Sequence, residues 1–539
     1  MKSRCFKCAV GSLVFVALAP GFRSTAQIAT ADRPNIIIFL ADDLGYADLG
    51  CQGCTDIPTP HIDSIAKNGV RFTQGYATHS VCAPSRAGLL AGMYQHRFGF
   101  EHNPGPERFA AANFGLPRNI PTLAEKLKAA GYATGMIGKW HVGFKEGLRP
   151  WERGFDYFFG FLGGARSYYP NTPREQDPLL RNGRIVTDEK EYLTDAFGRE
   201  AVAFIERSRG QPWFLFLSFS AVHSPMEATE KYLSRFSNLT GTRRIYAAML
   251  SAMDDAVGRV LAKVHELNQE DDTLIFFTSD NGGPTLQTTS RNDPLRGYKG
   301  SLFEGGIRVP FLMQWKRVVP GGIVYEKPVT GFDIHVTALA AAKVPLASQP
   351  HLDGVNLIPF VTGQQSGSPH DILFWRAGRQ HAVRMGDWKL LHDGRGARDM
   401  LFNLAEDIGE TRDLASEKPE ILRQLQAAYE KWDKEMMPAQ WVRQDARNAE
   451  PGGRLKTAIP RGSAAGEESR RTLQEIFKAA DADGDGKLSK SEFPRSAIFA
   501  AVDADGDGFA TWEEVRAYFA SERNQPLPRS SQEGPVRER

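Results

Sequence analysis

Four stretches of the sequence place acidic, basic or imidazole side chains within a few residues of the end of an apolar run: Asp42 and Asp43; Lys139 and His141; His223; and Asp280 and Asn281. The carboxylate and amide oxygens suit Ca²⁺ or Mg²⁺ better than Zn²⁺, which prefers nitrogen and sulfur ligands. Three carboxylates in one pocket repel each other unless a divalent cation neutralises them. The pattern therefore indicates a site for a hard cation, although a helix start and an Asp-Asn-Gly turn explain the same residues without one.

Basic side chains supply the opposite charge. Arg86, Lys139 and Lys299 can bind a tetrahedral oxyanion, and Arg86 offers a planar fork of donors. His141 and His223 can exchange protons near neutral pH, although a lone histidine is as often a structural residue. These residues predict a pocket in which an oxyanion lies beside a cation.

The apolar runs that precede these residues explain how they could meet. Residues 36–40, 133–137, 213–217 and 274–277 are apolar without alternation, which is typical of strands buried on both faces. Helical patterns lie between them, including 120–130, with Thr122 as its N-cap, and 245–267. Strands that alternate with helices predict an α/β fold with a mostly parallel sheet. Ligands bind at the carboxyl ends of such strands, so one shared site is expected there.

Composition narrows the class of protein. The chain has 539 residues, and 66 basic against 64 acidic residues give a net charge of +2, too small to steer nucleic acid. Hydrophobic residues make up 41%, which excludes a disordered or collagen-like chain. The mean hydropathy of −0.37 and the lack of long apolar runs beyond the N-terminus exclude a polytopic membrane protein. Five cysteines in this length exclude a disulfide scaffold.

The N-terminus has the order of a secretory signal peptide. Lys2, Arg4 and Lys7 precede the uncharged residues 9–20, and small residues at 24–26 offer a cleavage site. Residues 1–26 are therefore predicted to be a signal peptide of a secreted or periplasmic protein, with an uncleaved anchor as the alternative. No integral membrane segment is expected after cleavage. Cys51 and Cys54 either form a local disulfide or are small thiols.

One motif carries a resemblance to a known family. The stretch Cys82-Ala83-Pro84-Ser85-Arg86 resembles the signature of the type I, formylglycine-dependent sulfatases, with an arylsulfatase-like pattern over residues 34 to about 435. Ala91 departs from it, because many members carry Thr there. The other matching residues are Asp42, Asp43, Lys139, His141, His223, Asp280, Asn281 and Lys299.

The resemblance implies a fold and a domain order. The fold is alkaline-phosphatase-like, with a mostly parallel sheet sandwiched by helices in a catalytic domain at 27–365. A smaller α+β subdomain follows at 366–440. A formylglycine-generating or anaerobic sulfatase-maturing enzyme would convert Cys82, and one catalytic Ca²⁺ would be held by Asp42, Asp43, the modified Cys82, Asp280 and Asn281.

The implied reaction is sulfate ester hydrolysis. One hydroxyl of the hydrated aldehyde attacks sulfur, while the cation, Arg86, Lys139 and Lys299 stabilise the charge. His223, with Lys299, protonates the leaving alcohol, and His141 takes the proton of the second hydroxyl as sulfate departs. Similar members cleave sulfated glycans, which makes these the expected substrates. Trp151, Arg166, Tyr168 and Tyr169 either line a sugar subsite or pack within the protein.

Two further classes of function remain open. The chain could be a phosphate or phosphonate ester hydrolase of the same superfamily, although that chemistry favours two metals with additional histidine ligands or a Ser or Thr nucleophile. It could instead be an inactive protein that binds glycan or calcium, because the sequence does not reveal whether Cys82 is oxidised.

The C-terminal part contains two acidic loops. After a Pro-, Gly- and Arg-rich linker at 441–466, residues 467–522 resemble an all-α EF-hand pair, followed by a disordered tail at 523–539. The expected ligands are Asp481, Asp483, Asp485, Lys487, Ser489 and Glu492 in the first loop and Asp503, Asp505, Asp507, Phe509, Thr511 and Glu514 in the second. Each loop would bind one Ca²⁺. Their close spacing resembles dockerin-like modules, which suggests a cohesin-type protein partner.

Overall fold

The computed structural model describes residues 33–441, apart from 106–109, 171, 173–176, 350 and 395–397, and in the C-terminal part 477, 481, 483–489, 502–503, 505 and 507–522. The predicted signal peptide, most of the linker, the tail and Glu492 lie outside these residues. Within them, no helix combines the length and the apolar character that a membrane crossing requires.

A ten-stranded sheet forms the centre of the region that was predicted to be catalytic, called the catalytic region below, in the order β11-β2-β10-β9-β1-β8-β4-β5-β6-β7. In chain order its strands are β1 Asn35–Ala41, β2 Val70–Phe72, β4 Ala133–Lys139, β5 Tyr157–Phe161, β6 Leu180–Arg181, β7 Arg184–Ile185, β8 Trp213–Ser218, β9 Thr273–Ser279, β10 Phe311–Gln314 and β11 Ile323–Tyr325. The four predicted strands are its adjacent members β9, β1, β8 and β4, and all of them pair in parallel.

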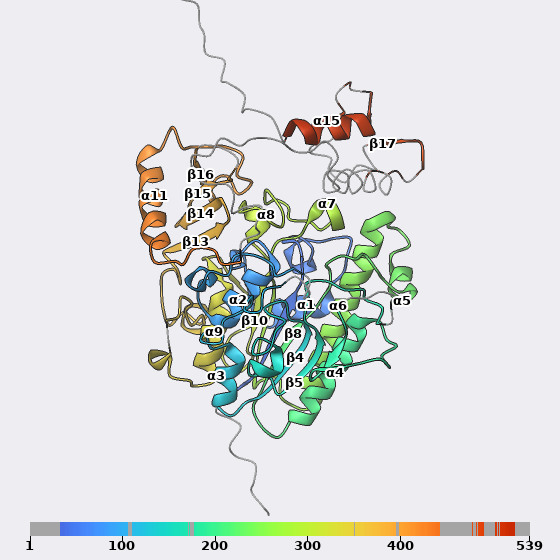
Figure 1. Cartoon of the computed structure of the whole chain (residues 1–539), viewed down its shortest axis with the longest axis vertical. Coiled ribbons are helices and arrows are strands. Elements are labelled where there is room, and N and C mark those ends of the chain that lie inside the picture. Colours follow the sequence, from blue (N-terminus) through green and yellow to red (C-terminus); the bar gives the residue numbers. More distant parts are fainter. Residues whose placement is uncertain are drawn as a thin grey trace, which may run out of the picture.

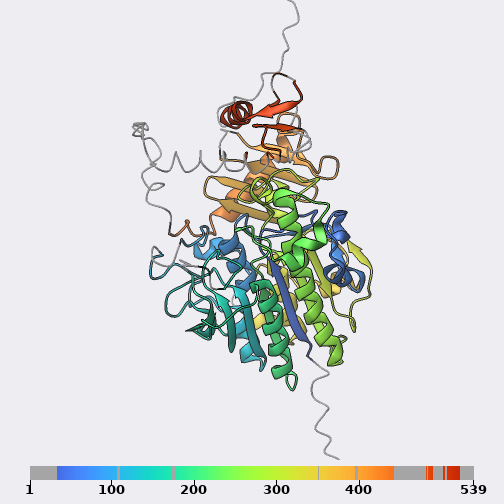
Figure 2. The same cartoon turned by 90° about the vertical axis from the view of Figure 1, so that its right-hand side faces the viewer.

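Helices cover both faces of this sheet (Figures 1 and 2), as expected for the α/β fold. One apolar core joins it to α1 Pro60–Lys67, α4 Leu193–Ser208 and α6 Gly241–Glu266. The other core joins it to α2 Cys82–Ala91, α3 Leu123–Ala129 and α9 Gly331–Ala341. Residues 36–41 of β1 alternate between the two cores, so this part of the strand is apolar throughout. A capping box between Thr122 and Glu125 starts α3, which confirms the predicted N-cap.

Shorter elements complete the catalytic region. They are the strands β3 Gly75–Tyr76 and β12 Val329–Thr330, which pair with each other, and the helices α5 Glu230–Leu233, α7 Thr285–Thr288, α8 Glu304–Ile307 and α10 Ile358–Val361.

The smaller subdomain is an antiparallel sheet covered by one helix, in orange in Figure 1. Its strands are β13 Ile372–Ala377, β14 Gln380–Met385, β15 Trp388–His392 and β16 Met400–Asn403, and its helix is α11 Pro419–Asp433. One face of the sheet packs on α11, and the other packs on Tyr76, Leu302 and Ile307 of the catalytic region.

A buried ionic network strengthens this second interface. Lys389 of β15 contacts Glu304 at 2.9 Å and Glu410 at 2.8 Å, and all three side chains are fully buried. Burial beside Glu304 raises the pKa of Glu410, while Lys389 opposes the rise. The lysine therefore holds two carboxylates that would otherwise repel each other in a dry environment.

The C-terminal module contains α15 Trp512–Glu522 and a short antiparallel pair, β17 Lys487–Ser489 and β18 Phe509–Thr511. This pair joins the two acidic loops and adds a small sheet to the expected helices. Phe477, Leu488, Val502, Ala510 and Val515 form its apolar cluster.

Candidate active site

The carboxyl ends of the four adjacent parallel strands bring the predicted site residues together. Asp42 and Asp43 follow β1, and Asp280 and Asn281 follow β9. Lys139 is the last residue of β4, and His223 lies in the segment after β8. Cys82 and Arg86 come from the first turns of α2, so the thiol and the guanidinium face the same strand ends.

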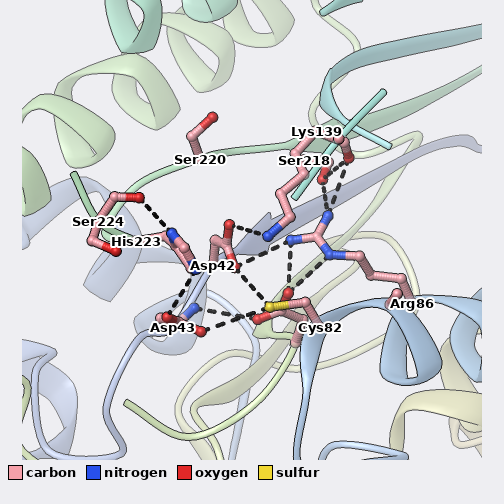
Figure 3. Close-up of polar contacts among 12 residues, drawn as sticks. Asp42, Asp43, Cys82, Arg86, Lys139, Ser218, Ser220, His223 and Ser224 are labelled. Carbon is pink, nitrogen blue, oxygen red and sulfur yellow. Dashed lines mark hydrogen bonds and ion pairs between the residues drawn. The ribbon is translucent and has the colours of Figure 1, made fainter. Parts of the chain in front are cut away.

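Cys82 lies against the first acidic pair (Figure 3). Its Sγ is 3.5 Å from Asp42 Oδ1 and 3.9 Å from Asp43 Oδ1. One ligand atom from each of Asp42, Asp43, Cys82 and His223 lies within 4.8 Å of the others. Burial raises the pKa of the Cys82 thiol to about 12, although Lys139 and Lys299 oppose the rise. An unmodified Cys82 is therefore protonated near neutral pH and a weak nucleophile.

Each carboxylate in the pocket has a cationic partner. Lys139 Nζ donates to Asp42 Oδ2 at 2.6 Å, and Lys299 Nζ lies 2.7 Å from Asp43 Oδ1. Arg86 Nη2 lies 2.7 Å from Asp280 Oδ2. Burial alone would raise the pKa of Asp280, but Arg86 and Lys139 bring it below its ordinary value. Three buried negative charges are thus matched by three positive ones, as burial requires.

Two of the three nitrogens of the Arg86 guanidinium donate hydrogen bonds within the protein, whereas Nη2 has only ion-pair contacts. Its Nε donates to Asp280 Oδ2 at 2.9 Å, and its Nη1 donates to Ser218 Oγ at 2.6 Å and to the Lys139 carbonyl at 3.1 Å. The sequence suggested a fork open to substrate, whereas here the fork joins the ends of β4, β8 and β9. Arg86 therefore supplies positive charge and positions Asp280.

The two histidines differ in environment. His223 Nδ1 is 2.6 Å from the Ser224 carbonyl, so this nitrogen carries the hydrogen. Its Nε2 lies 3.5 Å from Asp43 Oδ2 and is the position at which a proton can be gained or lost. Burial, together with Lys139 and Arg86, lowers the pKa of His141 well below its ordinary value. His141 is therefore a neutral imidazole.

The pocket fits a hard divalent cation. Asp42, Asp43, Asp280 and Asn281 are all buried and present oxygen atoms. Asn281 Nδ2 donates to Asp43 Oδ1 at 2.7 Å, whereas its buried Oδ1 has no hydrogen-bond partner among the described residues. A buried oxygen without a donor is costly unless a cation binds it.

Local backbone geometry supports this arrangement. Asp43 and His141 have left-handed φ angles of 64° and 60°, which are uncommon for residues other than glycine and cluster at functional sites. A Cβ at Gly164 would lie 2.7 Å from the His141 ring, so glycine is needed there.

The aromatic residues considered for a sugar subsite mostly serve as supports. The Tyr168 hydroxyl donates to the carbonyls of Ser220 and His223, at 2.6 and 2.8 Å, and holds the His223 segment. Arg166 is buried and binds backbone carbonyls, and Trp151 packs on Phe158. Tyr169 is exposed. Contacts within the protein therefore explain Tyr168, Arg166 and Trp151.

Sequence reasoning missed several supporting residues. Ser218 anchors Arg86, and Asn103 Oδ1 accepts a hydrogen bond from the Ala83 amide at the start of α2. Only the position of Ser218 at the end of a buried strand gave any indication. Cys51 and Cys54 are free thiols, which agrees with the second of the two expectations.

The C-terminal loops present their carboxylates in the order expected of EF-hands. Ligand atoms of Asp481, Asp483 and Asp485 lie within 4.8 Å of one another, as do those of Asp503, Asp505 and Glu514. The Gly486 amide donates to Asp481 Oδ2 and the Gly508 amide to Asp503 Oδ2, both at 3.0 Å. The other described ligand positions are Lys487, Ser489, Asp507, Phe509 and Thr511.

Known protein families match two regions of the chain, the catalytic region and the C-terminal module. A family model described as sulfatase matches residues 34–344, and EF-hand models match 473–495 and 496–520. Arylsulfatase J of Mus musculus is 30% identical over 484 residues, which cover 79% of this chain and 80% of that protein. N-acetylgalactosamine-6-sulfatase of Homo sapiens is 33% identical over 376 residues, 66% of this chain and 71% of that one.

A solved structure is also similar to this chain over most of its length. The crystal structure of Ps i-CgsB in complex with k-i-k-neocarrahexaose has a TM-score of 0.73 and is 35% identical, and the match covers 77% of this chain and 96% of that one.

Proposed function

The chain belongs to the sulfatase family, and from this premise we propose that it releases inorganic sulfate from sulfated glycans by means of a formylglycine made from Cys82. As a sulfuric ester hydrolase it acts on sulfate esters. The observation that carries the proposal is the position of Cys82 Sγ, 3.5 Å from Asp42 and 3.9 Å from Asp43, beside Arg86, Lys139 and Lys299.

Two groups complete this site, and the residues present fit both. A divalent cation would be held by Asp42, Asp43, Asp280, Asn281 and the modified Cys82, and it would polarise a sulfuryl oxygen. Formylglycine, once formed and hydrated, would supply the oxygen nucleophile that the protonated thiol does not provide.

The lysines stabilise the sulfuryl group. Lys139 and Lys299 hold positive charge beside Cys82, where negative charge grows on the sulfuryl oxygens. Both now pair with carboxylates, and these carboxylates are the proposed ligands of the cation. Arg86 acts through Asp280, whose orientation it fixes.

The histidines divide the proton transfers. His223 is fixed by the bond from its Nδ1 to the Ser224 carbonyl, which leaves Nε2, on the side of Asp43, as the nitrogen proposed to act on the leaving alcohol. His141 is held neutral by its surroundings and accepts the proton of the residue at position 82. The two proton transfers of ester cleavage are thus proposed to use two different side chains.

A sulfated glycan is the proposed substrate class. Support comes from a neighbour solved in complex with k-i-k-neocarrahexaose and from a relative named N-acetylgalactosamine-6-sulfatase. We further propose that residues 1–26 direct the chain out of the cytoplasm. Residues 27–365 would form the catalytic domain and residues 366–440 its subdomain. A sulfatase-maturing enzyme would be a partner. Each EF-hand loop would bind one Ca²⁺, with a second protein as the partner of the module at 467–522.

A substrate panel tests the proposal. Purified enzyme is given sulfated oligosaccharides, an aryl sulfate and a phosphate monoester, and inorganic sulfate or phosphate is measured. We expect fastest release from a sulfated oligosaccharide and none from the Cys82→Ala variant. Faster release of phosphate than of sulfate would contradict the proposal.

A further inference from the structure

A second group of metal-type side chains lies on the smaller subdomain. His381 of β14 pairs directly with His392 of β15, and Asp399 comes one residue before β16. Leu391 pairs with Met400, so the next position along brings Asp399 beside His392. Three neighbouring strands thus bring two imidazoles and a carboxylate into one row.

All three side chains lie on the face that α11 covers. The Tyr429 ring of α11 stacks on His381, with centroids 4.1 Å apart and planes 12° apart. Gln426 Nε2 donates to Asp399 Oδ2 at 2.8 Å. The side chains are 13–24% exposed, so a small ion can reach them from solvent.

The two imidazoles turn to the same carboxylate oxygen. His392 Nδ1 is 2.9 Å from Asp399 Oδ1, whereas His381 Nε2 is 3.6 Å from it, which is too long for a hydrogen bond. One ligand atom from each residue lies within 4.8 Å of the others. The rings are parallel within 2°, with centroids 4.9 Å apart, so both nitrogens face one small volume.

From this geometry we propose that His381, His392 and Asp399 bind a transition-metal ion of the zinc class. Two imidazole nitrogens and one carboxylate oxygen are ligands that Zn²⁺ accepts in tetrahedral sites, with water as the fourth, whereas Ca²⁺ and Mg²⁺ prefer oxygen alone. The hydrogen bond from Gln426 fixes the orientation of the carboxylate, as outer-shell partners do in metal sites.

The position of this site suggests its role. The ion would join β14, β15 and β16 at the end of the sheet where β14 begins. Gln380, next to His381, donates its Nε2 to the carbonyl of Gly300 at 3.1 Å, and Gly300 follows Lys299. The ion would therefore stiffen the part of the subdomain that contacts the Lys299 loop.

Zinc binding to the untagged full-length chain tests the proposal. Excess Ca²⁺ is present to fill the oxygen-rich sites, and bound zinc is measured by competition with a chromophoric chelator. We expect His381→Gln and His392→Gln to bind one equivalent less than the unmodified protein. The matched control is His351→Gln, because the exposed His351 pairs with a single carboxylate, Asp353, at 2.9 Å. This variant should retain full binding.

Two further readouts keep the result unambiguous. Zinc should raise the Tm of the unmodified protein and of His351→Gln, but not the Tm of the two site variants. Sulfate release measured without zinc should show that all variants are folded. Tetrahedral Co²⁺ absorption should disappear in the site variants. The proposal would be overturned by equal zinc binding in all proteins. It would also be overturned by a Co²⁺–thiolate band that persists in the site variants, because such a band would assign the metal to Cys51 or Cys54.

Discussion

The catalytic pocket and the EF-hand loops use the same oxygen chemistry under opposite physical conditions. The ion pairs of the pocket join residues far apart in the sequence, such as Lys299 with Asp43 and Arg86 with Asp280, and its carboxylates are buried. In the loops the carboxylates bond to amides two to nine residues away and are largely exposed. Buried charges need partners from distant elements, whereas exposed loop charges are stabilised locally and by water.

This difference predicts that the pocket fails when one residue is changed and that the loops act separately from it. The largest effect is expected at Cys82. Cys82→Ala removes the source of the proposed nucleophile, so turnover should be abolished. The measurement is sulfate release from the best oligosaccharide. Cys51→Ala, which changes a thiol outside the pocket, should keep the unmodified rate. Substantial turnover by Cys82→Ala would count against the mechanism.

Removing one buried cation should have the next largest effect. Lys139→Ala deletes a positive charge that we propose stabilises the sulfuryl oxygens, and it removes the lysine that pairs with Asp42. We expect kcat to fall on the order of 10²–10³-fold, which is the usual cost of one charge-stabilising donor. Lys128→Ala is the control, because Lys128 is exposed and pairs with Asp156 on the surface. Similar rates for the two variants would refute the assigned role.

The same contrast extends to the interface of the subdomain. Lys389→Met leaves Glu304 and Glu410 as buried carboxylates without the lysine that pairs with both. The free energy of unfolding should drop by about 3–5 kcal/mol, as measured by urea denaturation. Arg412→Ala breaks the exposed pair with Glu417 and should cost at most about 1 kcal/mol. Equal losses would show that burial does not set the value of these pairs.

The smallest effect on catalysis is expected from the loops. The double variant Asp481→Ala with Asp503→Ala removes the first ligand of each loop, so calorimetry should show two fewer Ca²⁺ bound per chain. The value of kcat should stay within about twofold, because loop ligands are local and the pocket has its own. A collapse of activity in calcium-containing buffer would show that the two regions are coupled.

The sequence predicted much of this arrangement because its strongest patterns are local. Uninterrupted apolar runs at 36–40 and 274–277 identified two of the adjacent parallel strands, and the polar residues after them identified the edge that holds the site. Carboxylates of the C-terminal loops fall at fixed spacing, so their clustering was predictable too.

Long-range register was not predictable. The sequence places Ser218 at a strand end but does not show that it anchors Arg86, and nothing near Tyr168 indicates that its hydroxyl holds the His223 segment. His381, His392 and Asp399 meet only because three antiparallel strands align in one register. Such contacts depend on how distant elements pack, which a pattern along the chain does not record.

The central claim is that the residue at position 82 acts as a formylglycine beside the acidic pairs. Mass spectrometry of the peptide that spans residue 82, taken from catalytically active protein, tests this most directly. Conversion replaces CH₂SH by CHO, so we predict a peptide lighter than the unmodified form by roughly 18 Da, in proportion to activity. Fully active protein with an unmodified thiol at this position would contradict the account.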